Sequence, residues 1–246
     1  MTRRQSKIRV VIGTQSNQYV AQRVLEYSIR KHSAADIEIV PTRQQVGRVG
    51  GTRFGFVRFC IPSMFDYEGR AIYMDADQVV LGDVADLHST LDEDHAVALV
   101  QRPEGFFAGR PVEPRNETSV MVLDCNKLKE WDPDHLFEHV VPNRARLRPS
   151  QIHYKDFVRL KWIDPALLQA LPPSWNHYNI VREDSQLVHF SHVREQPWKR
   201  PTHPLTKFWE GWLVETLEAG YLTRQDILRE VAKLHLHPRF LRYTWR

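Results

Sequence analysis

Two aspartates, Asp75 and Asp77, stand two positions apart at the end of an apolar run, and two carboxylates at this spacing can bind one metal ion. The run at residues 71–74 has the composition of a buried strand. Carboxylates that follow such a strand are costly to bury unless a cation compensates them. Side chains at positions i and i+2 of an extended segment point the same way, so both carboxylates can reach one ion. Oxygen ligands favour magnesium, manganese or calcium over zinc.

The motif alone leaves other interpretations open. The two aspartates can instead cap a turn, or the helix that residues 82–87 suggest. A phosphatase of the haloacid-dehalogenase type also places a D-x-D motif after an apolar strand. In that class the strand usually comes first in the domain, whereas here a complete strand-helix-strand unit precedes the motif.

The chain of 246 residues has the composition of an ordinary globular protein, because 42% hydrophobic residues are enough for a sizeable core. No stretch approaches the ~20 apolar residues of a membrane span, and the first residues lack the apolar segment of a signal peptide. Two cysteines, Cys60 and Cys125, are too few for a disulfide framework and match no zinc spacing. We therefore expect an intracellular, cytoplasmic protein.

The formal charge of +4 and the pI near 9.1 suit an anionic ligand, a nucleotide or an anionic membrane surface. Nucleic acid is not an expected partner, because the basic residues are dispersed and no helix-turn-helix, zinc-finger or RNA-platform motif accompanies them. Residues 238–246 interleave arginines with aromatics. This pattern fits either peripheral contact with the inner face of a membrane or a strap packed on the domain. The oligomeric state stays open.

The elements that must position the aspartates begin with a strand at residues 7–14, a helix at 18–31 and a second strand at 37–40. A parallel α/β sheet begins in this way, and its ligands bind beyond the carboxyl ends of the strands. The turn at residues 13–19 is such a place. It contains neither GxGxxG nor GxxxxGK[ST], so a metal ion and basic side chains must neutralise any diphosphate bound there.

The rest of the chain continues the alternation of strands and helices. The sequence predicts a mobile basic loop at residues 43–53, a helix at 54–64, strands at 95–100, 119–124 and 185–190, a long binding loop or lid at 101–118, a short helix at 126–130, an irregular segment at 171–176 and helices at 204–220 and 223–234. The last helix is expected to be capped by Thr223 with Asp226 and to bury Ile227, Leu228, Val231 and Leu234.

In their order, these stretches resemble glycosyltransferase family 8, which includes glycogenin, galactinol synthase and bacterial lipopolysaccharide galactosyl- and glucosyltransferases. The resemblance covers residues 7–198. Its main motifs are Tyr73-Met74-Asp75-Ala76-Asp77 with Val80-Leu81-Gly82-Asp83, similar to YLDADxxVxGD; residues 171–176, similar to LPxxWN; and His189-Phe190 with Gln196-Pro197-Trp198-Lys199, similar to a closing HY(x)KPW clip.

The resemblance implies an α/β fold of the GT-A type, with a Rossmann-like nucleotide-binding sheet, flanking helices and a helical C-terminal end. It divides the chain into a glycosyltransferase domain at residues 1–200 and a helical extension at residues 201–246 packed on the same domain. It also implies transfer of a hexosyl group from a UDP-sugar to a saccharide or other glycan acceptor, with retained configuration and with Mn²⁺ or Mg²⁺ as cofactor. The departing phosphate then helps to deprotonate the acceptor hydroxyl.

The resemblance assigns roles to individual residues. The expected metal ligands are Asp75, Asp77 and His189. The residues expected to bind the nucleotide sugar are Gly13, Thr14, Tyr19, Arg58, Asp75, Ala76, Asp77, Asn116, Ser119, Gln196 and Lys199. The expected catalytic residues are Asp156 and Lys155, with Asp156 as the acid nearest the transferred sugar.

The chain departs from the family pattern in three places. Ser16 replaces the Asp or Asn that precedes the uracil-stacking aromatic, which leaves uracil selectivity open. Residues 154–156 keep only the last acid of a DQD or EQD triplet, and Gln196 replaces the lysine of the clip, although Lys199 and Arg200 follow closely. The last two departures motivate an alternative, a nucleotide-sugar-binding or scaffold protein without turnover.

Overall fold

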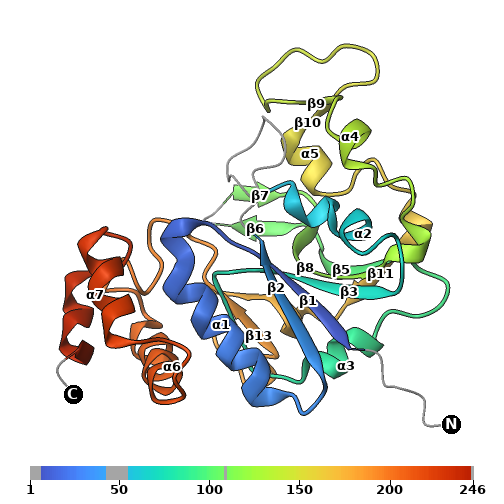
Figure 1. Cartoon of the computed structure of the whole chain (residues 1–246). Helices are drawn as coiled ribbons and strands as arrows, with labels where there is room; N and C mark the ends of the chain where they lie inside the picture. Colours follow the sequence, from blue (N-terminus) through green and yellow to red (C-terminus); the bar gives the residue numbers. More distant parts are fainter. Residues whose placement is uncertain (1–6, 43–54, 108–109, 245–246) are drawn as a thin grey trace, which may run out of the picture. The chain divides into compact units, whose positions relative to one another are not determined.

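A computed structural model of the chain describes residues 7–42, 55–107 and 110–244 (Figure 1). The basic loop expected at residues 43–53 lies outside these residues. The chain forms two compact units, each built from three separate segments. The first unit contains Met1–Gly13, Asp36–Met74 and Asp86–Pro173, and the second contains Thr14–Ala35, Asp75–Ala85 and Ser174–Arg246.

A six-stranded sheet forms the centre of the first unit. Its spatial order is β11 (Leu168–Leu171), β5 (Val97–Arg102), β8 (Arg115–Asp124), β3 (Arg70–Asp75), β1 (Ile8–Gly13) and β2 (Ile37–Thr42). The pairs β1–β2 and β11–β5 are parallel, whereas β8 runs antiparallel to β3 and β5. The expected parallel start is therefore confirmed within a mixed sheet. Residues 71–74 of β3 are fully buried, as their apolar composition predicts.

Short elements complete the first unit. They are η2 (Val57–Phe59), α2 (Ile61–Met64), β6 (Gly105–Phe107), β7 (Arg110–Val112), η3 (Cys125–Lys127), α4 (Pro133–Leu136), β9 (Val140–Val141), β10 (Ile152–His153), α5 (Tyr154–Val158) and η4 (Pro165–Leu167). Aromatic side chains join several of them in one core. Phe157 stacks on Trp162 with ring centroids 5.1 Å apart and meets Phe59 edge-on at 4.8 Å.

Two expectations in this unit are wrong. The helix expected at residues 54–64 is split into η2 and α2, because Pro62 has no N–H and is tolerated only in the first turn of a new helix. The loop expected at residues 101–118 contains the hairpin β6–β7 and the first residues of β8. Its prolines do not prevent this, because Pro103 and Pro114 lie outside the strands and Pro111 lies in a two-stranded hairpin.

The second unit combines helices with a small sheet. The helical elements are η1 (Ser16–Gln18), α1 (Tyr19–His32), η5 (Pro173–Asn176), α6 (Thr206–Glu218), α7 (Arg224–Ala232) and η6 (Pro238–Thr244). In the sheet, β13 (Leu187–His189) pairs in parallel with β12 (His177–Tyr178) and antiparallel with β4 (Gln78–Val80). α3 (Val84–Ser89) begins in this unit and ends in the first.

The C-terminal helices belong to the same compact unit as α1. Contacts between side chains join them to this helix. Tyr27 of α1 meets Trp212 of α6 at a centroid distance of 6.2 Å, and Arg23 Nε donates to the Tyr221 carbonyl at 2.8 Å. Helices α6 and α7 are thus part of one core with α1.

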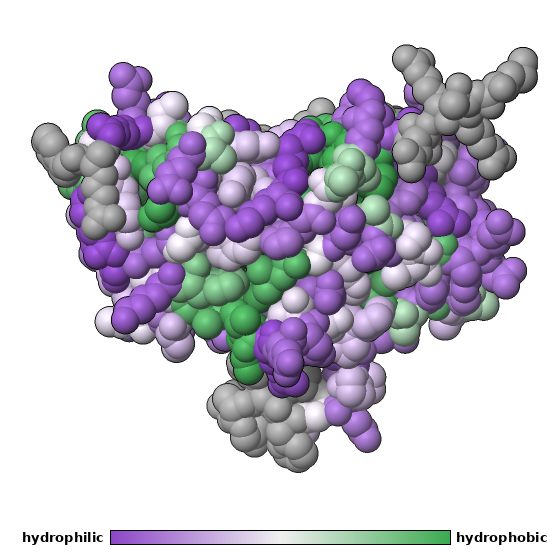
Figure 2. All heavy atoms as spheres, turned by 90° about the horizontal axis from the view of Figure 1, so that it is seen from below, coloured by the Kyte–Doolittle hydropathy of each residue, from purple (hydrophilic) through white to green (hydrophobic). Residues whose placement is uncertain are grey.

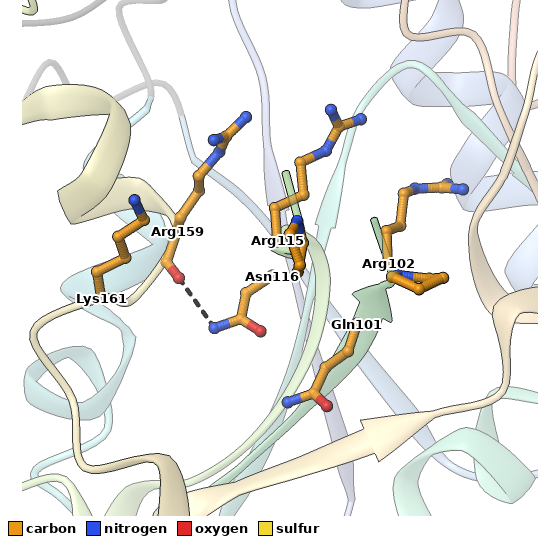
Figure 3. A pocket seen from close by; sticks show the side chains of 8 residues that line it. Gln101, Arg102, Arg115, Asn116, Arg159 and Lys161 are labelled. Atoms are coloured by element: carbon orange, nitrogen blue, oxygen red, sulfur yellow. Dashed lines mark hydrogen bonds between the residues drawn. The ribbon is translucent and has the colours of Figure 1, made fainter. Parts of the chain in front are cut away.

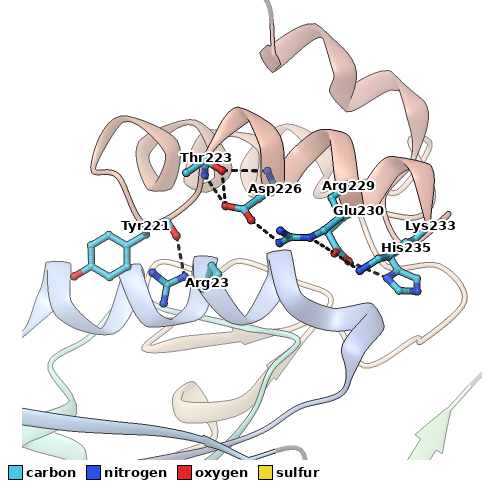
Figure 4. A network of polar contacts seen from close by, with 8 residues as sticks. All are labelled: Arg23, Tyr221, Thr223, Asp226, Arg229, Glu230, Lys233 and His235. Carbon is cyan, nitrogen blue, oxygen red and sulfur yellow. Dashed lines mark hydrogen bonds and ion pairs between the residues drawn. The ribbon is translucent and has the colours of Figure 1, made fainter.

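Helix α7 has the expected capping box, in which Thr223 and Asp226 bond reciprocally (Figure 4). Ile227 and Val231 are buried as expected, but Leu228 is 46% exposed and Leu234 is 84% exposed. The helix ends at Ala232, and Leu234 follows in the left-handed conformation with φ 58°, so the helical period does not continue to it.

No helix among the described residues is both long and apolar enough to cross a membrane. On the face drawn in Figure 2, hydrophilic side chains predominate and hydrophobic ones gather in limited patches.

Candidate active site

The D-x-D motif lies where the chain leaves β3 and enters β4. Asp75 ends β3 and is partly exposed, Ala76 is fully buried, and Asp77, directly before β4, is 6% exposed. Strand β4 was not expected from the sequence. Its three residues, one of them polar, are too few to show a strand pattern, and only their pairing with β13 makes them a strand.

His189 reaches the aspartates because β13 pairs with β4. The register sets His189 opposite Gln78, the neighbour of Asp77, and the Phe190 N–H donates to the Asp77 carbonyl at 2.9 Å. The ligand atoms of Asp75, Asp77 and His189 all lie within 4.8 Å of one another. Within residues 7–42, 55–107 and 110–244, they form the one group of three such side chains close enough to share a metal ion.

Asn176 orients the imidazole of His189. The Nδ1 atom lies 3.1 Å from Asn176 Oδ1, an amide oxygen that can only accept, so Nδ1 carries the proton and donates it. The Nε2 atom then faces Asp77 Oδ1 at 3.3 Å. A neutral imidazole held in this way presents Nε2 as a metal ligand. Asn176 belongs to the segment expected to be irregular, which instead contains the 3₁₀ turn η5.

Gln196 and Lys199 approach Asp77 from the loop after β13. Gln196 is fully buried, and its Nε2 donates to Asp77 Oδ2 at 2.8 Å and to the Phe190 carbonyl at 3.1 Å. Burial lowers the pKa of Lys199, and the charge of Asp77 opposes this shift. The replacement of the clip lysine by glutamine thus leaves a neutral hydrogen bond on Asp77 and a separate amino group within electrostatic reach.

The donor set fits a divalent ion. Asp77 Oδ1 is buried, and no described residue donates a hydrogen bond to it. A buried carboxylate oxygen in this state is stabilised by a cation, and a set of two carboxylates and one imidazole is compatible with manganese or magnesium.

Tyr19, expected to contact the uracil base of the nucleotide, is the first residue of α1, and its ring makes a cation–π contact. The Arg229 guanidinium is 5.1 Å from its ring centroid. Thr14 is 1% exposed, and Gly13 ends β1 in the first unit. Arg229 was not singled out from the sequence, because only the packing of α7 on α1 brings it to Tyr19.

In the first unit, Arg58 is 8% exposed, and its Nη1 donates to the Thr118 carbonyl and hydroxyl at 2.7 and 2.8 Å. Its guanidinium also lies 4.7 Å from the Tyr73 ring centroid. Arg58 is therefore a fixed part of this unit's core, and its role toward a sugar donor stays a prediction.

The start of β8 is joined to the end of α5. Thr118 Oγ1 donates to the Val158 carbonyl at 2.8 Å, and Asn116 Nδ2 donates to the Arg159 carbonyl at 3.0 Å. These side chains satisfy carbonyls that a helix end leaves without partners. Ser119 is 6% exposed and follows directly, where the pairing of β8 with β5 shifts register.

Asp156 pairs with Lys161, whose Nζ lies 2.8 Å from its Oδ1, and this hydrogen bond lowers the pKa of Asp156. The pair forms because α5 ends in a left-handed Leu160 with φ 57°. The Lys161 N–H donates to the Asp156 carbonyl and the Leu160 N–H to the Phe157 carbonyl, which folds Lys161 back over Asp156. Lys155 is exposed, and its backbone N–H donates to Asn143 Oδ1 at 2.7 Å.

The sequence model of the family described as Glycosyl transferase family 8 matches residues 12–138, just over half of the chain. Protein CDI of Arabidopsis thaliana is 25% identical over 214 residues, which cover 77% of this chain and 79% of the plant protein.

Solved structures of glycosyltransferases are similar in fold. WbbM, described as bifunctional, has a TM-score of 0.61 at 13% identity and covers 85% of this chain. GlyE of Streptococcus pneumoniae TIGR4 has a TM-score of 0.63 at 16% identity and 85% coverage. The galactosyltransferase LgtC, solved with donor and acceptor sugar analogues, has a TM-score of 0.56 at 11% identity, with 85% of this chain and 96% of LgtC covered. This chain spans 50% of the WbbM chain and 60% of the GlyE chain. The expected α/β fold of the GT-A type is confirmed.

Proposed function

The chain belongs to glycosyl transferase family 8, and from this membership we propose that it is a metal-dependent, retaining hexosyltransferase that uses a UDP-sugar and a hydroxyl acceptor. The observation that most supports this proposal is the convergence of Asp75, Asp77 and His189 within 4.8 Å, with His189 oriented by Asn176. A haloacid-dehalogenase-type phosphatase is not proposed, because the family is one of transferases.

A divalent ion held by these three side chains, Mn²⁺ or else Mg²⁺, would act as a Lewis acid on the departing phosphate, an effect worth several kcal/mol. The two aspartates supply negative charge to that ion, and His189 Nε2 supplies a neutral ligand. Asn176 and Gln196 hold the ligands in place through the hydrogen bonds at 3.1 and 2.8 Å. Lys199 adds a positive charge for the diphosphate.

In this proposal, Asp156 lies beside the transferred sugar. Its hydrogen bond to Lys161 lowers its pKa and keeps it ionised near neutral pH. An ionised carboxylate stabilises the partial positive charge at the anomeric carbon in the transition state. The acceptor hydroxyl attacks on the face from which the nucleotide leaves, and its proton passes to the departing phosphate.

The test is incubation with Mn²⁺ and a panel of nucleotide sugars, with release of nucleoside diphosphate as the readout. The Asp77→Asn variant should lose metal-dependent release and metal-dependent UDP binding while its circular dichroism is unchanged. Asp184→Asn makes the same chemical change at an exposed position of the same unit and is the control. Full manganese-dependent activity of Asp77→Asn would contradict the assignment. Proton NMR of the product should show the anomeric configuration of the sugar donor.

The alternative function, nucleotide-sugar binding without turnover, is motivated by Lys155 and by Gln196, which donates to Asp77 in place of a lysine. Binding of nucleotide sugars with neither hydrolysis nor transfer in the same assay would favour it.

We also propose a cytoplasmic location, because Cys60 and Cys125 are both free and buried, which suits a reducing compartment.

A further inference from the structure

A pocket of about 460 Å³ in the first unit has a strongly cationic lining (Figure 3). Arg102 comes from the end of β5, Arg115 from the start of β8, and Arg159 and Lys161 from the turn after α5. Figure 3 shows the charged ends of these side chains directed to the same side of the Asn116 amide. Segments that are distant in sequence thus bring their positive charges together.

Two carboxylates pair with three of these four positive groups. A single oxygen of Glu117 lies 3.2 Å from Arg102 Nε and 2.5 Å from Arg115 Nε. Asp156 compensates Lys161 at 2.8 Å. Among the described residues, Glu117 is thus shared by two arginines, and Asp156 is paired with Lys161.

Arg159 is the fourth positive group of the lining. Its carbonyl is fixed by Asn116 Nδ2, and its side chain is half-buried. Within the part of the chain that the structure describes, its guanidinium makes no ion pair or hydrogen bond. A half-buried guanidinium offers a planar set of donors that matches the two oxygens of a phosphate or carboxylate.

We propose that this pocket binds a phosphate or carboxylate group carried by the acceptor, so that the enzyme glycosylates an anionic acceptor. The inference rests on the proposed function. Two observations favour the acceptor over the diphosphate of the donor. Lys161 lines the pocket and pairs with Asp156, the residue assigned to the transferred sugar, which the acceptor hydroxyl attacks. The diphosphate has its own compensating groups in the other unit, namely the metal ligands and Lys199.

The experiment follows the side-chain Nε–Hε resonances of Arg115 and Arg159 by NMR in ¹⁵N-labelled protein at constant ionic strength. The probes are inorganic phosphate, glucose 6-phosphate, glucuronate and glucose. Both resonances should shift with the charged probes and not with glucose, and the probe that binds more tightly separates a phosphorylated from a carboxylated acceptor. The shifts should persist with saturating Mn²⁺ and UDP.

Arg159→Gln should weaken binding of the preferred charged probe about tenfold, the effect of losing one charge-assisted interaction. Arg159→Lys should weaken binding of the same probe less than Arg159→Gln does. Arg148→Gln, at an exposed position of the same unit, should leave the affinity unchanged. Circular dichroism of each variant checks folding.

Equal binding of glucose and the charged probes, or equal weakening by Arg148→Gln, would overturn the proposal. Displacement of the probes by Mn²⁺ and UDP would assign the pocket to the diphosphate instead. Metal-dependent UDP binding is measured on the same samples. If it persists while no charged probe binds, this inference fails and the proposed function stands. If it is absent while charged probes bind, the proposed function fails and with it the acceptor assignment.

Discussion

At the scale of single residues, the two oxygens of Asp77 have different environments. Oδ2 accepts from Gln196 at 2.8 Å, which fixes the rotation of the carboxylate. Oδ1 faces His189 Nε2 at 3.3 Å and accepts no hydrogen bond from a described residue. The neutral glutamine therefore orients the carboxylate without neutralising it, so the charge stays available to a metal ion.

Gln196→Ala should weaken Mn²⁺ binding, because it removes the hydrogen bond that orients Asp77. The loss expected for such a supporting group is about 10- to 100-fold in metal affinity. Titration calorimetry with Mn²⁺ measures it, and Gln225→Ala, at an exposed position of the same unit, is the control. An unchanged Mn²⁺ affinity would mean that Gln196 serves only the packing of its loop.

Asp156→Ala should reduce kcat far more than it changes affinity for the sugar donor, because the charge of Asp156 matters chiefly in the transition state. Lys161→Gln gives a separate readout. Lys161 lowers the pKa of Asp156, so its removal should raise that pKa and move the acid limb of the kcat profile to higher pH. A fully active Asp156→Ala enzyme would make this residue an ordinary surface charge.

The three candidate metal ligands, Asp75, Asp77 and His189, can be named from the sequence because they stand in local motifs. The residues that support these ligands are harder to predict from the sequence. The bond from Asn176 to His189 depends on the pairing of β13 with β4, and Arg159 enters its pocket only after α5 turns. The pairing of Lys161 with Asp156 could not be predicted for another reason. The left-handed position that ends α5 is held by Leu160, and a helix end of this kind is usually marked by a glycine.

At the scale of elements, long periodic segments are predictable and short ones are not. The sequence identifies β1, α1, β2, α6 and α7, because 3.6-residue or strand patterns run through each of them. The three-residue strands β4, β6 and β7 exist only through pairing, so no local pattern marks them. Leu228 and Leu234 fit the helical period of α7, yet the sequence does not reveal which positions the rest of the unit covers.

Leu234→Gly should stabilise the protein by about 0.5–1 kcal/mol, because φ is 58° and the side chain is 84% exposed. Leu228→Gly is a matched control with the opposite expected sign. It makes the same change at an exposed position inside α7 and should cost about 1 kcal/mol. Urea unfolding of both variants gives the two free energies. Destabilisation by Leu234→Gly would contradict the left-handed end of α7.

The buried Glu230 should make stability depend on pH (Figure 4). Burial raises its pKa, but hydrogen bonds from His235, Arg229 and Lys233 outweigh burial and lower the pKa below 4.5. Its contribution is therefore complete above the unfolded pKa and is lost as pH falls through the folded pKa. Glu230→Gln should cost about 1–3 kcal/mol at neutral pH, and the difference should shrink below about pH 4.5. A difference that does not vary with pH would contradict this account.

At the scale of the whole molecule, the positive net charge suits an anionic ligand, a nucleotide or an anionic membrane surface, but it does not say where on the molecule such a partner binds. The net charge is +4 in a chain with 34 basic residues, so the excess could be spread over the whole surface. The fold instead collects four positive groups in one pocket of the first unit, from three separate segments. The division of the chain into two discontinuous units is likewise absent from any local pattern.

The C-terminal segment provides the last prediction, because its arginines and aromatics fit either a membrane contact or a strap. Phe240 is fully buried and meets Trp209 edge-on at 5.6 Å, while Arg239 and Arg242 both bind Glu210, at 2.6 and 2.8 Å. The described residues thus form a strap. Arg239→Gln with Arg242→Gln should lower the free energy of unfolding by about 1–3 kcal/mol, because it leaves Glu210 buried without its cations. Co-sedimentation with anionic liposomes at two salt concentrations should be the same for this variant and the parent. Salt-sensitive binding that disappears in the variant while its stability is unchanged would instead assign these arginines to a membrane surface.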